Sequence, residues 1–219
     1  MGTFKQGIHG NFSGKVGNVV GSSWKGKGVM RIRPASVSNP RTEKQQSVRG
    51  KFALVGRFTA RLSSLIADGF KSYAIGITAH NAAMMYNLKY GLNGVYPDLS
   101  LNMNEMKISL GDLPLAMDLS AIKSGDNALQ LSWTDNSSEP GAAPNDLLSI
   151  GIYDVEREKA LKFRGQFQRA QSGGLLEIPA YWLDRTLHVF AFFKSQTHDA
   201  GSEYYVSESI YLGSFDMSS

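Results

Sequence analysis

The amino-acid sequence predicts an α+β protein in two parts, residues 1–104 and residues 105–219. Three observations support this fold class. Glycines divide the first 34 residues into short pieces, apolar residues then recur at helical spacing as far as Tyr90, and beyond Glu105 the pattern changes to alternation. We therefore expect a glycine-rich β-hairpin and two helices, followed by an antiparallel β-sandwich.

The first part begins with two β-favouring runs, residues 16–20 and 29–32, joined by a wide turn over residues 22–27. Trp24 stands in that expected turn, between lysines at positions 25 and 27. Two roles for Trp24 are open. Its ring could stack on a base or a partner surface, or it could fold back as the cap of a small core.

A helix is expected next, because Thr42 and Gln45 have the spacing of a capping box and Gly69 is a natural terminator. It would run to about Asp68. The apolar residues that share one stripe of this helix are Val48, Phe52, Val55, Leu62 and Ile66. The arginines on the opposite side are Arg49, Arg57 and Arg61. A second helix is expected over residues 78–90, before Gly91.

The second part contains about seven short β runs separated by turn clusters. The expected strands are residues 106–110, 129–134, 148–152, 160–163, 175–178, 187–193 and 204–212. Apolar and polar residues alternate in the clearest of them, which is typical of half-buried strands. This number of short strands predicts an antiparallel sandwich.

Charge is divided unevenly along the chain. Residues 1–61 contain twelve Lys or Arg and one acid, Glu43, whereas the remainder contains eleven basic and eighteen acidic residues. The two parts carry +11 and −7, which sum to the net charge of +4. Such a division suggests a basic binding segment on an acidic body. A polyanion such as nucleic acid, an acidic surface of another copy, and plain solvation all remain open as explanations.

Composition excludes several classes of protein. The 219 residues include 42% apolar residues, enough for a sizeable core, and no cysteine, so disulfides, thiolate metal sites and a cysteine nucleophile are impossible. No apolar run approaches the roughly 18 to 20 residues of a membrane span, and no apolar run follows Lys5. We expect no membrane span, no secretion signal and a cytoplasmic location, with assembly or export by an unconventional route as the alternative.

The motifs of common enzymes are incomplete. Residues 21–28 match a phosphate-binding loop, G-x-x-x-x-G-K-[ST], except that Gly28 replaces the hydroxyl residue that would bind magnesium, and a β-like run follows instead of a helix. The four histidines show no metal-ligand spacing, and no serine lies in a G-x-S-x-G turn. We therefore expect no catalytic residue, no metal and no cofactor. An unrecognised enzyme would need a deep pocket between the two parts.

Several segments resemble the signature of an uncharacterised bacterial family, a domain of unknown function. They are G-K-V-G-N-V-V-G at residues 14–21, W-K-G at 24–26, N-P-R-T at 39–42, S-W-T-D-N at 132–136, V-S-E-S at 206–209 and Y-L-G at 211–213. This resemblance implies no activity, ligand or catalytic residue. Residues 105–213 also resemble a fibronectin type III or other immunoglobulin-like module, except that His188 stands where that pattern has a tyrosine.

These observations favour a non-enzymatic binding or structural protein, whose basic N-terminal region engages a protein partner or another copy in an oligomer. The alternative is a nucleic-acid-binding protein that uses the same region. The candidate binding residues are Trp24, Lys25, Lys27, Arg31, Arg33, Arg49, Arg57 and Arg61. Salt distinguishes the two, because phosphate contacts weaken steeply as salt rises.

Overall fold

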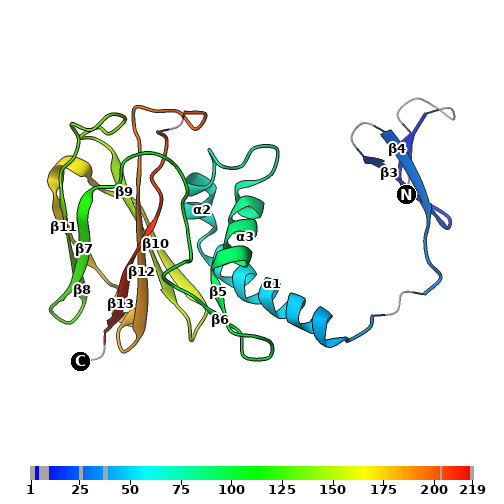
Figure 1. The fold of residues 1–219 in the computed structure, drawn as a ribbon, viewed down its shortest axis with the longest axis horizontal. Coiled ribbons are helices and arrows are strands. Elements are labelled where there is room, and N and C mark those ends of the chain that lie inside the picture. The colour runs from blue at the N-terminus through cyan, green and yellow to red at the C-terminus, as the bar shows by residue number, and fades with distance from the viewer. Residues whose placement is uncertain (1–2, 5–9, 25–26, 37–38, 203, 218–219) are drawn as a thin grey trace. The chain divides into compact units, whose positions relative to one another are not determined.

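The structure is a computed structural model that describes the chain except residues 1–2, 5–9, 25–26, 37–38, 203 and 218–219. It divides into two compact units, Met1–Thr42 and Glu43–Ser219. Helices and several antiparallel sheets are present, which confirms the α+β class (Figure 1). The boundary expected after residue 104 stays a prediction, and the solubility and unfolding of chains that begin at residue 43 or at residue 105 are its test.

The first unit is a four-stranded antiparallel sheet with the order β1-β2-β3-β4. Its strands are β1 (Thr3–Phe4), β2 (Phe12–Val16), β3 (Val19–Trp24) and β4 (Lys27–Ile32). The prediction of a wide turn over residues 22–27 is wrong, because the ladder between β3 and β4 continues to the pair Trp24 and Lys27. The run expected at residues 16–20 is also interrupted. Gly17 has a φ of 58° and reverses the chain between Val16 and Val19, as the first position of a two-residue hairpin loop requires.

Three helices begin the second unit: α1 (Glu43–Arg61), α2 (Ser63–Gly69) and α3 (Ala79–Tyr90). The single helix expected as far as Asp68 is therefore two helices that meet at Leu62. The second expected helix is confirmed, and the Thr78 side chain caps it by accepting from the Asn81 N–H at 3.2 Å.

The remaining strands form two larger sheets and one small hairpin. The strands are β5 (Leu92–Asn93), β6 (Ser100–Leu101), β7 (Met117–Ser124), β8 (Ala128–Thr134), β9 (Leu147–Asp154), β10 (Lys159–Gln168), β11 (Gly173–Glu177), β12 (Thr186–Lys194) and β13 (Ile210–Asp216). Their orders are β11-β8-β7, β10-β9-β12-β13 and β5-β6. Two short 3-10 helices, η1 (Arg169–Gln171) and η2 (Ala180–Trp182), lie in the connections.

The strand expected at residues 106–110 is not formed, because the backbone of this segment bonds to other groups. Leu110 N donates to the carbonyl of Gly69 at 2.9 Å, and Ile108 N donates to Ser209 Oγ at 2.9 Å. A Cβ at Gly69 would lie only 2.3 Å from Ile108 O, so the close approach of α2 to this segment requires glycine. The segment is thus an irregular connection between the helices and the sheets.

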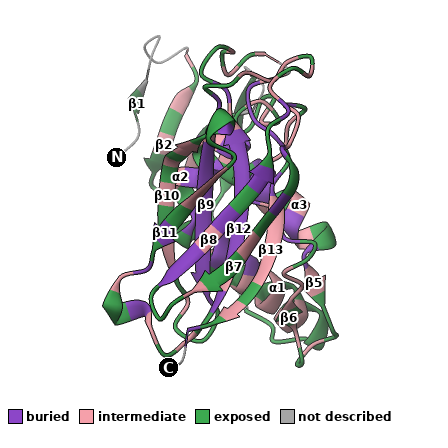
Figure 2. Cartoon of the chain, turned by 90° about the vertical axis from the view of Figure 1, so that its left-hand side faces the viewer, coloured by how far each residue is buried: buried purple, intermediate pink, exposed green. Residues whose placement is uncertain are grey.

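The second unit has three layers (Figure 1). The β10-β9-β12-β13 sheet lies in the middle, with α1–α3 on one face and the β11-β8-β7 sheet on the other. Both faces of its central strands are buried, as the purple of β9 and β12 in Figure 2 shows. Along β12, Val189 and Ala191 face the neighbouring sheet, whereas Phe190 and Phe192 face the helices. Successive side chains of this strand therefore pack in two different apolar clusters.

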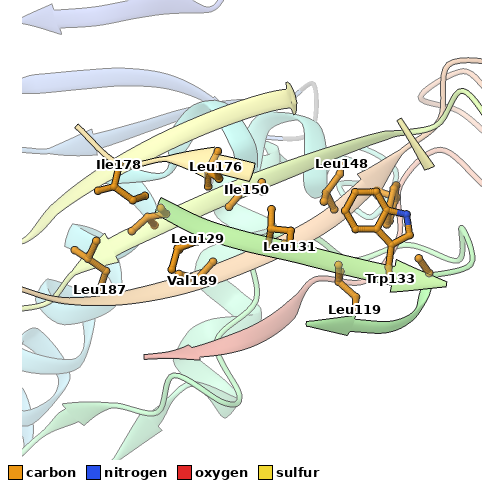
Figure 3. Close-up of a cluster of buried hydrophobic side chains, with 14 of the residues drawn as sticks. Leu119, Leu129, Leu131, Trp133, Leu148, Ile150, Leu176, Ile178, Leu187 and Val189 are labelled. Carbon is orange, nitrogen blue, oxygen red and sulfur yellow. The ribbon is translucent and has the colours of Figure 1, made fainter. Parts of the chain in front are cut away.

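The cluster between the two sheets is shown in Figure 3. Leu129, Leu131 and Trp133 extend from β8 toward Leu148 and Ile150 of β9. On the other face of β9, a Cβ at position 151 would lie 3.0 Å from a Leu65 methyl group, a tight contact. The helices therefore pack closely on the middle sheet.

A buried polar network holds one end of the sandwich. The Arg169 guanidinium, fully buried, donates from Nε to Asp146 Oδ2 at 3.1 Å and from Nη1 to the side-chain oxygen of Asn136. Trp133 Nε1 donates to the Arg169 carbonyl at 2.7 Å. Burial lowers the pKa of Arg169, and the charge of Asp146 opposes that effect. Trp133 and Asn136, both in the S-W-T-D-N segment, therefore have structural roles.

Candidate functional site

The register of the N-terminal sheet gives it two chemically different faces. Val16 pairs with Val19 and Val19 with Ile32, while Gly14 pairs with Gly21 and Gly21 with Met30. Directly opposed residues in an antiparallel ladder point to the same side of the sheet. One face, which we call the apolar face, therefore carries Val16, Val19, Met30 and Ile32, with Gly14 and Gly21 between them.

The described part of its own unit leaves most of the apolar face uncovered. Met30 is 71% exposed and Ile32 is 77% exposed, and all six residues of β4 are exposed. Among the residues of this unit whose side chains are described, only Gly21 is buried. A Cβ at Gly21 would lie 2.7 Å from the Phe12 ring, so the ring lies against the glycine backbone. The sheet thus has no apolar core in its described part.

The opposite face carries positive charge together with Val20 and Val29. Lys15 pairs with Val20 and Val20 with Arg31, and alternation along β4 places Lys27 on the same side. We call these three side chains the basic face, and all of them are exposed. Arg33 follows β4 and extends the ladder, since its N–H donates to the Asn18 carbonyl at 2.7 Å. Residues 1–42 contain seven Lys or Arg and no acid, so no carboxylate of this unit neutralises the face.

The structure thus brings together two of the predicted binding residues, Lys27 and Arg31, with Arg33 directly after them. Trp24 lies in β3 opposite Lys27, but its side chain is outside the described part of the structure, as is Lys25. Lys15 was missed. The signal that identifies Lys15 is its place in the alternation of residues 12–16, because the strand ends at Val16 and does not continue to residue 20.

The three arginines of α1 belong to the other unit, and two of them have partners there. Arg57 Nε lies 2.8 Å from Glu158 Oε1, and Arg61 Nε donates to the Glu158 carbonyl at 2.8 Å. They hold the turn between β9 and β10 against the helix. Arg49 is exposed on the same helix and also has an interaction within the chain. The three residues therefore do not extend the basic face as a set of free cations.

The apolar stripe expected on the first helix, which the structure divides into α1 and α2, is confirmed only in its C-terminal part. Val55, Leu62 and Ile66 are buried. Val48 is 54% exposed and Phe52 is 53% exposed, contrary to the expectation. The reason is that the N-terminal half of α1 meets the small β5-β6 hairpin, where Tyr96 Oη donates to Gln46 Oε1 at 2.8 Å, instead of the wide middle sheet.

Other candidate chemistry has a structural explanation. The described residues of the segment 21–28 lie in β3 and β4, and the next helix begins only at Glu43. His188 Nδ1 lies 2.7 Å from Tyr211 Oη, and burial lowers the pKa of this histidine.

No group of three or more potential metal-binding side chains occurs within the described residues. None of the helices in that part of the chain is long and apolar enough to span a membrane.

Comparison with known proteins adds one match. Residues 11–213 match the model of a protein family whose function is unknown. No curated protein matches the chain. The matched residues include β2, β3 and β4, which carry both faces of the N-terminal sheet.

Proposed function

The chain belongs to DUF6266, a family of unknown function, and we propose that it is a non-enzymatic binding or assembly protein whose N-terminal sheet docks on a protein surface. The observation that carries this proposal is the exposed apolar face of the sheet. Met30, Ile32 and Val16 lie on one side of a sheet that has no second layer of its own in the described part of its unit.

Energetics support docking on another surface. Full burial of an aliphatic side chain of this size is worth roughly 1.5 to 3 kcal/mol, and ordering each residue of a strand costs about 1 to 2 kcal/mol. A sheet that buries almost no apolar surface therefore gains little free energy from its own folding. A protein partner or a second copy of the chain would supply the missing apolar contact.

Self-association is tested by light scattering on the full chain over a range of concentrations and salt. We expect a discrete oligomer that persists at high salt and that the double change Met30→Ser and Ile32→Ser converts to a monomer. Val29→Ser is the matched control, because Val29 lies on the same strand but on the other face. A wild-type chain that is monomeric throughout would overturn self-association and direct the search to a protein partner.

The basic face supports a second candidate function, binding to nucleic acid. Lys15, Lys27 and Arg31 present three cations on one side of a unit without acids, and phosphates release counterions when such residues bind them. Fluorescence anisotropy with a mixed-sequence DNA or RNA fragment tests this. Changing all three residues to Ala should abolish a salt-sensitive signal, whereas Lys71→Ala, an exposed cation of the other unit, should leave it unchanged.

We also propose that β7–β13 form an immunoglobulin-like sandwich. In constant-type immunoglobulin domains the first, second and fifth strands share one sheet, and the third, sixth and seventh share the other. The strands β7, β8 and β11, and the strands β9, β12 and β13, have this distribution. The fourth strand differs, since β10 pairs with β9. Superposition of an experimental structure on known modules of this kind is the test.

The cytoplasmic location expected from the sequence is also a proposal. Fractionation of cells that express the full chain would test it.

A further inference from the structure

A small pocket with positively charged walls lies within the Glu43–Ser219 unit. It forms where the turn between β9 and β10 meets η2 and the start of β12, and it has a volume of about 210 Å³. Ala160, Leu161 and the buried Trp182 supply apolar lining, and Tyr181, which is 73% exposed, stands beside them. Sites for drug-sized ligands occupy roughly 300 to 1,000 Å³, so the occupant of this pocket must be smaller.

Cations outnumber acids in the lining. Arg157, Lys159 and Arg185 face a single carboxylate, that of Asp154. The side chains of Arg157 and Lys159 have no ion pair with any described residue. Two positive charges therefore remain uncompensated around a partly apolar cavity. This combination favours a small anion that carries an apolar group.

Arg185 is the cation that the protein satisfies least. Its side chain is only 13% exposed, and its single ion pair is a long contact of 3.3 Å from Nη1 to Asp154 Oδ2. Its Nε is buried without an acceptor among the described residues. Nε itself is closed to solvent, so the donor that Arg185 has left for an anion in the pocket is Nη2, which makes no hydrogen bond to a described residue and is not among the buried unpaired atoms.

The turn that carries Arg157 is held in place before any ligand binds. Arg57 Nε lies 2.8 Å from the Glu158 carboxylate, and Arg61 Nε donates to the Glu158 carbonyl at 2.8 Å. The Asp154 carboxylate accepts from the Arg157 backbone N–H at 3.1 Å. A preformed turn reduces the entropy lost on binding, so even a small ligand can be held.

From this pocket we propose a further site: the chain binds a small carboxylate or phosphate compound, with Arg157, Lys159 and Arg185 around the anionic group and Trp182 against its apolar part. Guanidinium groups suit both carboxylate and phosphate, because their N–H donors match the oxygens of either group. The site is independent of the docking proposed for the N-terminal sheet.

The test follows the indole N–H signals of the full chain by NMR during titration with sodium benzoate and, separately, with inorganic phosphate, at constant ionic strength. We expect a saturable shift of the Trp182 signal with at least one of the two probes. The Trp133 indole is the internal control, since it is buried and donates to the Arg169 carbonyl. Saturation by benzoate alone would identify a carboxylate ligand, and saturation by phosphate alone a phosphate ligand.

Variants make the test specific. The double change Arg157→Ala and Lys159→Ala should weaken binding by about tenfold or more, because it removes two charge-assisted contacts. Lys162→Ala, an exposed lysine of the same strand outside the pocket, is the matched control and should change affinity by less than about twofold. A Trp182 signal that does not saturate with either probe, or an equal response in both variants, would overturn the proposal. A parallel shift of Trp133 would overturn it as well.

Discussion

Two four-stranded antiparallel sheets in this protein differ in what covers them. In the β10-β9-β12-β13 sheet, both faces of β12 are buried, by the helices on one side and by a second sheet on the other. In the N-terminal sheet, every residue of β4 is exposed. Antiparallel ladder pairing is present in both sheets, so it does not make the difference. Apolar burial by neighbouring layers does, and among the residues that the structure describes those layers occur in the larger unit.

The glycine positions show why one sheet has layers and the other does not. Gly14 and Gly21 occupy the middle of the apolar face, where the larger sheet has Leu, Ile and Phe. Glycine provides no side chain to pack and loses more conformational freedom on folding than any other residue. The two sheets should therefore respond differently to substitution.

The largest effect is expected from a core truncation in the larger unit. Phe190→Ala removes a fully buried ring that lies 5.6 Å from Phe58 and 5.2 Å from Tyr211, and should lower the free energy of unfolding by about 3 to 5 kcal/mol. Met30→Ala in the N-terminal sheet should change it by less than about 0.5 kcal/mol. Urea denaturation measures both. Equal losses would show that the N-terminal sheet has a core after all.

A second effect concerns the buried network of the larger unit. Arg169→Met leaves Asp146 buried without its partner and should cost about 3 to 5 kcal/mol of unfolding free energy. Arg164→Met removes an exposed partner of Asp68 and should cost less than about 1 kcal/mol. Thermal or urea unfolding of the two variants is the measurement. A small loss in Arg169→Met would mean that Asp146 finds another partner or takes up a proton.

A third effect depends on pH. Burial lowers the pKa of His188 below its ordinary value of 6.5, so below that pH the unfolded chain binds this proton more readily than the folded chain. The wild type should therefore lose stability as the pH falls from about 6.5 toward the folded-state pKa. His188→Gln should show a smaller loss over the same interval. Identical pH slopes in urea denaturation would contradict the assignment.

The smallest effect on global stability is expected at Gly21. A Cβ there would lie 2.3 Å from Phe12 O, so Gly21→Ala should disturb the pairing of β2 with β3. NMR signals of residues 12–32 should lose their strand-like dispersion, while the free energy of unfolding of the larger unit changes by less than about 0.5 kcal/mol. A clear fall in that free energy would show that the two units are energetically coupled.

Element types were predictable where one local pattern decided them. The helix α3 was expected over residues 78–90 because good helix formers lie between a capping threonine and a terminating glycine. β8 and β9 were expected from clean alternation. β7 was missed, since its residues alternate poorly and its pairing with β8 is interrupted after Met117. The grouping of basic residues on the N-terminal sheet was predicted in part, because residues 27, 31 and 33 lie on or beside β4; their role in binding stays a prediction.

The charge division, the absence of thiol chemistry and the types of most elements follow from composition and from neighbours a few residues apart, so they can be read from the sequence. Three arrangements depend on tertiary packing: Lys15 lies on one face with Arg31, Glu158 contacts Arg57 and Arg61, and Arg185 lines a pocket with Arg157. The contacts of Glu158 join residues about a hundred positions apart. Such contacts depend on how layers pack, and no local periodicity encodes that packing.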